Sequence, residues 1–73
     1  MRVSKGQARR VGAQLGVSWV RDDIDIREFW MGMNVEMEHT DVTKGNLKLT
    51  GKIALAHLKE LPDYYTRLKE MEK

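Results

Sequence analysis

Cysteine is absent from this 73-residue chain. No apolar run approaches the roughly 18 residues that a membrane-spanning helix requires. Without cysteine the chain has no disulfide, no thiolate metal site and no cysteine nucleophile. The N-terminus lacks an apolar core followed by a small-residue cleavage site, so we expect no signal peptide. These absences predict a cytoplasmic protein without membrane association.

Charge is small in total but uneven along the chain. Residues 1–21 carry five basic side chains and no acid, whereas residues 22–41 carry seven acids and one base. In one interpretation the basic segment packs beside the acidic one. In the other it makes weak nucleic-acid contacts, and the basic residues concerned are Arg2, Lys5, Arg9 and Arg10. Residues 8–18 look like the first helix and turn of a helix-turn-helix, whose next helix enters the major groove. That next helix would contain Asp22, Asp23 and Asp25, which would face phosphates unfavourably.

Hydrophobic periodicity and capping signals predict four helices and no strand. Asp25 with Glu28 forms a capping-box pattern before the second helix. Pro62 suits the first turn of the last helix, where Asp63 favours the helix dipole. The sequence therefore predicts an all-α fold, a compact bundle of three main short helices plus a short C-terminal helix. We expect one small helical domain over 1–73, with helices at about 5–15, 26–39, 47–61 and 62–71.

Several apolar residues fall outside the stripes that define the helix faces. Met31 and Val35 lie off the stripe of the second helix, and Leu55 lies off that of the third. They indicate a second contact, with the N-terminal helix or with another subunit, so a protein partner or a homodimer is expected. Trp19 and Val20, in the connector before the second helix, are predicted to fold back as a lid on the core.

Two pairs of ionisable residues have matching helical spacing. Glu36 and His39 lie three residues apart, as do His57 and Glu60, so each pair occupies one face of its helix. If the second and third helices are antiparallel neighbours, the two pairs converge. Two imidazoles and two carboxylates suit Zn, Fe or Mn, with Asp63, Tyr64 and Tyr65 as supporting residues.

The same four residues have two other interpretations. They form a buried polar cluster that fixes helix register without metal, or they perform acid–base catalysis. Catalysis is the least favoured, because no nucleophile motif, phosphate loop or cofactor fingerprint accompanies them. The sequence thus predicts a small binding or accessory domain. A metal-free interaction module and a weak nucleic-acid binder are the alternatives.

Two segments of the chain resemble a known family. Residues 32–40 read GMNVEMEHT, and residues 50–68 read TGKIALAHLKELPDYYTRL. They resemble a domain of unknown function in small bacterial and phage proteins, which pair a Gly-x-x-Val-Glu-x-Glu-His segment with an Ile-Ala-x-x-His-Leu-x-Glu-x-Pro-Asp-Tyr-Tyr segment. The resemblance supports the helical fold, and the two segments contain Glu36, His39, His57 and Glu60. It implies no reaction.

Overall fold

A computed structural model describes residues 2–38 and 44–72, and every regular element in this part of the chain is a helix. The prediction of an all-α fold is confirmed. The helices are α1 (Lys5–Gln14), α2 (Ile26–Met37), α4 (Leu47–Glu60) and α5 (Tyr64–Met71). None of the helices within the described residues is long and apolar enough to cross a membrane.

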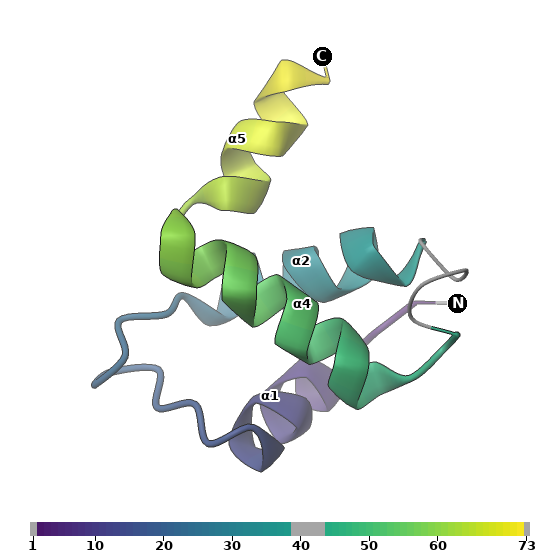
Figure 1. Ribbon diagram of the computed structural model, residues 1–73, viewed down its shortest axis with the longest axis vertical. Helices are drawn as coiled ribbons and strands as arrows, with labels where there is room; N and C mark the ends of the chain where they lie inside the picture. The colour runs from purple at the N-terminus through teal and green to yellow at the C-terminus, as the bar shows by residue number, and fades with distance from the viewer. Residues whose placement is uncertain (1, 39–43, 73) are drawn as a thin grey trace.

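The helices α1, α2 and α4 form the body of the molecule. α4 packs most extensively against α2 and also contacts α1, whereas α5 packs mainly on α2 and projects from the body (Figure 1). Gly51 of α4 permits the close approach to α1, because a Cβ there would lie 2.5 Å from Cγ1 of Val11. The buried apolar core is contributed by every helix and consists of Val3, Ala8, Val11, Ile24, Phe29, Met33, Met37, Ala54, Leu58 and Tyr65.

Trp19 and Val20, in the connector between α1 and α2, were both predicted to cover the core, and only Trp19 does so. The Trp19 ring packs against Phe29, with ring centroids 5.4 Å apart. Val20 is 92% exposed, so its place in the predicted lid was wrong. The reason is local, since the residue after Trp19 in this turn points away from the core. No helix forms between residues 15 and 25, which removes the second helix of a helix-turn-helix.

The segment before α1 is tied to α2 by three hydrogen bonds. The Val3 amide donates to Oδ1 of Asn34 over 2.7 Å. The Val3 carbonyl accepts from the Trp30 indole N–H over 2.7 Å and from Nδ2 of Asn34 over 3.0 Å. Val3 is itself buried. These hydrogen bonds therefore hold the segment before α1 against α2.

Candidate functional site

Three side chains from three helices meet at the hydroxyl of Tyr65. The hydroxyl lies 2.9 Å from Oε2 of Glu36 on α2 and 3.0 Å from Nδ1 of His57 on α4. His57 Nδ1 is also 3.2 Å from the same Glu36 oxygen. Glu36 is nearly buried, with 12% of its side chain exposed, while His57 retains 33%. The site is therefore a closed triangle of polar atoms beneath a partly exposed imidazole.

The protons in this triangle have one consistent arrangement. The Tyr65 hydroxyl donates to the Glu36 carboxylate, so its oxygen accepts from His57, which places a proton on Nδ1. Burial raises the pKa of Tyr65 well above its usual range, and the hydrogen bond to Glu36 and the charge of Glu36 raise it further. Tyr65 is thus a neutral donor and not a phenolate. The imidazole of His57 stacks on the Tyr64 ring, with centroids 4.5 Å apart.

The position of Tyr65 depends on a missing side chain in α2. A Cβ at Gly32 would lie 2.7 Å from Cδ2 of the Tyr65 ring and closer still to Cε2. Gly32 and Glu36 are one helical turn apart, so the ring lies over the glycine while its hydroxyl reaches the carboxylate. Residues 32–40, the first of the two segments that resemble the known family, therefore contain both the glycine that makes room for the ring and the carboxylate that accepts from its hydroxyl.

A second carboxylate of α2 holds the start of α5. Glu28 is buried and accepts from the backbone amides of Tyr65 and Thr66, each over 3.2 Å, and from the Thr66 hydroxyl. The predicted capping box with Asp25 is wrong, since Asp25 accepts from the Arg27 amide without help from Glu28. Glu28 instead satisfies the free N–H groups of another helix.

The start of α5 also differs from its prediction. The helix begins at Tyr64 and not at Pro62, and Asp63 at its N-cap makes no capping hydrogen bond. Asp63 pairs with Arg67 at 2.8 Å on the surface. The acceptor for the first amides of α5 is therefore a tertiary partner, Glu28, and not the residue that precedes the helix.

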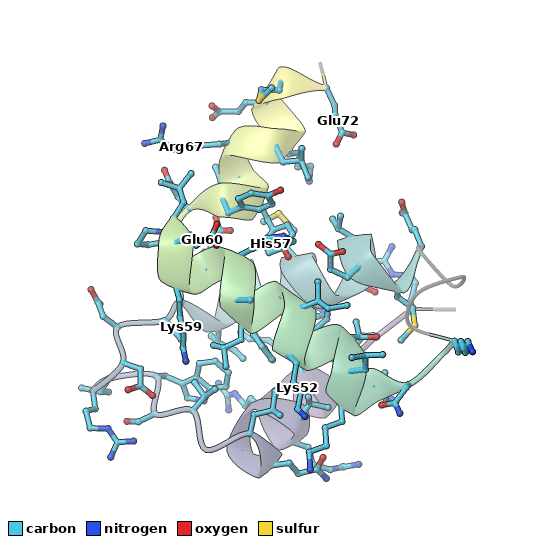
Figure 2. The ribbon with its side chains drawn as sticks, in the orientation of Figure 1. Lys52, His57, Lys59, Glu60, Arg67 and Glu72 are labelled. Atoms are coloured by element: carbon cyan, nitrogen blue, oxygen red, sulfur yellow. The ribbon has the colours of Figure 1, made fainter. Side chains whose placement is uncertain are left out.

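The structure brings together only part of the predicted cluster. Glu36 and His57 meet, and Tyr65, predicted as a supporting residue, lies at the centre. His39 falls outside the described residues. Glu60 is exposed at the end of α4, near the start of α5 (Figure 2), and it forms no hydrogen bond or ion pair with the residues that the structure describes. Its position follows from the helix, because Glu60 lies two positions after buried Leu58, which corresponds to a rotation of about 200°.

The predicted metal site has no preformed set of donors in the described chain. Across residues 2–38 and 44–72, no three His, Cys, Asp or Glu side chains are grouped so that they could hold a metal ion. Every buried side-chain nitrogen and oxygen there has a hydrogen-bond partner. The arrangement of Glu36, His57 and Tyr65 is that of a satisfied polar network linking three helices.

A groove of about 520 Å³ runs beside this network, between the N-terminal segment, α2 and α5. Its apolar lining is Trp30, Met31, Val35, Leu68 and the Tyr65 ring. Its charged rim is Arg2, Lys5, Arg27, Lys69, Glu38 and Glu72. Met31 and Val35, which lie off the apolar stripe of the second helix, are only half-buried and line this groove. Their spacing in the sequence had indicated a second contact but not its location.

The four basic residues predicted for nucleic-acid contacts are all exposed, and only two of them line the groove. Arg2 and Lys5 lie on the groove rim, whereas Arg9 and Arg10 lie on α1 outside it.

The chain was compared with known protein families, curated proteins and solved structures. A family model described as "Protein of unknown function (DUF5661)" matches residues 8–73. No curated protein and no solved structure matches the chain.

Proposed function

The chain belongs to the DUF5661 family of proteins of unknown function, and we propose that it is a protein-interaction module. The groove between the N-terminal segment, α2 and α5 holds an acidic, amphipathic helical segment of a partner protein. The single observation that carries this proposal is the apolar floor of the groove with its mainly basic rim.

The floor has the chemistry of a helix-binding groove. Trp30, Met31 and Val35 lie on the outer side of α2, and Leu68 faces them from α5. Amphipathic helices bind such grooves through apolar residues spaced three or four apart. Methionine is unbranched and polarizable, so Met31 adapts to more than one partner side chain. The 12 residues of α2 give a floor about 18 Å long, which accommodates a helix of about three turns.

The charge of the rim determines which sign of charge is favoured on the partner. Four basic side chains and two acidic ones border the groove. The basic ones come from both walls, with Arg2 and Lys5 on one side, Arg27 on α2 and Lys69 on α5. Rim charges chiefly increase the association rate and exclude partners of the wrong sign. An acidic segment is therefore favoured over a basic one.

In this proposal the polar network holds the groove in shape. The bonds from Tyr65 to Glu36 and His57 join α5 to α2 and α4, and Glu28 anchors the first turn of α5. A groove whose walls are already ordered loses less entropy when a partner binds. Acid–base catalysis is not favoured, since Tyr65 remains protonated and Glu36 is already engaged by its hydroxyl.

Two synthetic peptides of about 14 residues test the proposal. Both carry leucine at helical spacing, and their polar positions are glutamate in one and lysine in the other. In ¹H–¹⁵N spectra the glutamate peptide should shift the Trp30 indole signal and the amides of Met31 and Val35. The Trp19 indole is the internal control. Equal shifts with the lysine peptide, or no groove shifts with either peptide, would contradict the proposal.

A charge-loss pair sharpens the same experiment. Arg27→Gln with Lys69→Gln removes two rim charges and should weaken glutamate-peptide binding several-fold. Lys48→Gln with Lys52→Gln removes the same charge from α4, outside the groove, and should leave binding unchanged. Sedimentation should give a monomer, and a concentration-dependent dimer with the groove covered would assign the site to a second copy of this chain.

A transition-metal centre is the second candidate. The observation that favours it is the 3.2 Å separation of the His57 imidazole and the Glu36 carboxylate, which are ligand types for Zn, Fe or Mn. In this version His39 and His57 are the primary ligands, and Glu36 and Glu60 complete the shell. Elemental analysis of untagged protein purified without chelator, with melts before and after EDTA, tests it. Near-stoichiometric metal that His57→Ala removes would support the metal centre.

A further inference from the structure

The helices α1 and α4 carry charge of almost one sign. α1 contains Lys5, Arg9 and Arg10 and no acid. α4 contains Lys48, Lys52 and Lys59, and its one acid is the terminal Glu60. All six basic residues are exposed. Because these helices contact each other, bases distant in sequence lie on adjoining surfaces.

The three lysines of α4 form a single row beside α1. Gly51 marks the line of contact, since it faces Val11 of α1. At ~100° per residue, Lys48, Lys52 and Lys59 all fall roughly 60–100° from Gly51 on one side of it. The buried residues of α4 lie on the other side. Figure 2 shows Lys52 and Lys59 extending from the edge of α4 nearest α1 and the connector.

One base of α1 borders the same junction. Val11 faces α4, and Ala8 and Gly12 are buried on one side of Val11. Arg10 lies about 100° to the opposite, solvent side, and so faces the lysine row across the junction. We name the set of Lys48, Lys52, Lys59 and Arg10 the α1/α4 basic row. Along α4 the three lysines span about 16 Å, because Lys59 lies eleven positions after Lys48 and each position adds a rise of ~1.5 Å.

We propose that the α1/α4 basic row binds the phosphate backbone of nucleic acid without sequence specificity. A linear row of cations matches a linear polyanion with regularly spaced charges, and counterion release drives such binding. A bilayer is a poorer fit, because surface-bound helices insert a broad apolar face. The large hydrophobic residues exposed in the described chain are Val20, Leu49 and Met71, and of these only Leu49 lies on either helix.

One acid limits the row at its far end. Asp22 lies in the connector and lines the same small hollow as Lys59. It weakens the positive potential there, so Lys48 and Lys52 are the stronger contacts. Their exposed positions also make them safe to change without disturbing the core.

Salt dependence of oligonucleotide binding tests this surface. The probe is a fluorescein-labelled 20-base-pair duplex of arbitrary sequence, followed by anisotropy from 25 to 200 mM salt. Four phosphate contacts predict a slope of about −3.6 in log K against log salt, so affinity should fall about a hundredfold or more between 50 and 200 mM. Lys48→Gln with Lys52→Gln should halve that slope to about −1.8.

The groove pair, Arg27→Gln with Lys69→Gln, is the matched control, because it removes the same net charge from the other surface. It should retain the full slope. No binding at 25 mM salt, or equal weakening by the two pairs, would overturn the proposal. Binding of phosphatidylserine vesicles through Lys48 and Lys52, with no binding of duplex, would assign the surface to a membrane and overturn it as well. Each double variant tests one surface, so the groove and the basic row can fail independently.

Discussion

Glu28→Ala should destabilise α5 far more than Asp63→Ala, although Asp63 is the residue that precedes the helix. Glu28 accepts from the buried Tyr65 amide, the Thr66 amide and the Thr66 hydroxyl. A hydrogen bond to a charged group contributes about 1.5–3 kcal/mol, and water replaces part of this at exposed Thr66. We therefore expect Glu28→Ala to lower the free energy of unfolding by about 2–4 kcal/mol.

Asp63→Ala removes a different kind of interaction. Its ion pair with Arg67 lies on the surface, with 51% and 62% of the two side chains exposed. Such pairs contribute at most about 1 kcal/mol. A 73-residue chain typically has a total stability of roughly 4–11 kcal/mol. The free energy lost with the Glu28 contacts is therefore a large fraction of the total stability, whereas the free energy lost with the Asp63 ion pair is a small one.

Urea denaturation followed by far-UV circular dichroism measures both changes. Glu28→Gln keeps an oxygen acceptor without the charge and should fall between the wild type and Glu28→Ala. Amide exchange should show the largest loss of protection in α5, since α5 packs mainly on α2. Free energies for Glu28→Ala and Asp63→Ala within ~0.5 kcal/mol of each other would refute the reasoning, as this is the usual size of a surface effect.

Two further predictions concern Tyr65 and its notch. Gly32→Ala forces a Cβ into the Tyr65 ring and should cost about 1–3 kcal/mol in thermal or urea unfolding, whereas Gly6→Ala, at an open position on α1, should stabilise by about 0.5–1 kcal/mol. Equal effects of the two changes would argue against the notch. Because the folded pKa of Tyr65 is raised above its unfolded value near 10, its contribution is complete below that pH and is lost as pH rises further. Above pH ~10 the wild type should lose about 1.4 kcal/mol per pH unit more than Tyr65→Phe. Parallel alkaline stability curves would show that the hydroxyl is not buried beside Glu36.

The helices were predictable because their signals are local. Apolar spacing, caps and breakers located α1, α2 and α4 close to their observed bounds. The pairing of Glu36 with His57 was also accessible, since ionisable groups near a buried face must find partners. The exposure of Glu60 was not predictable, because helical spacing from His57 does not reveal on which side of His57 the core lies. Buried Leu58 decides that, and it leaves Glu60 in solvent.

By itself the sequence determined an all-α chain with its helices nearly in place and polar residues that had to be satisfied. The tertiary structure decided which residues satisfy them. Glu28 caps a helix that begins 36 residues later, and the hydroxyl of Tyr65 joins Glu36 to His57. The physical reason is that hydrogen bonds within a helix form between residues three or four apart, whereas these contacts exist only once α2, α4 and α5 have packed. The groove and the α1/α4 basic row likewise arise from which helices become neighbours.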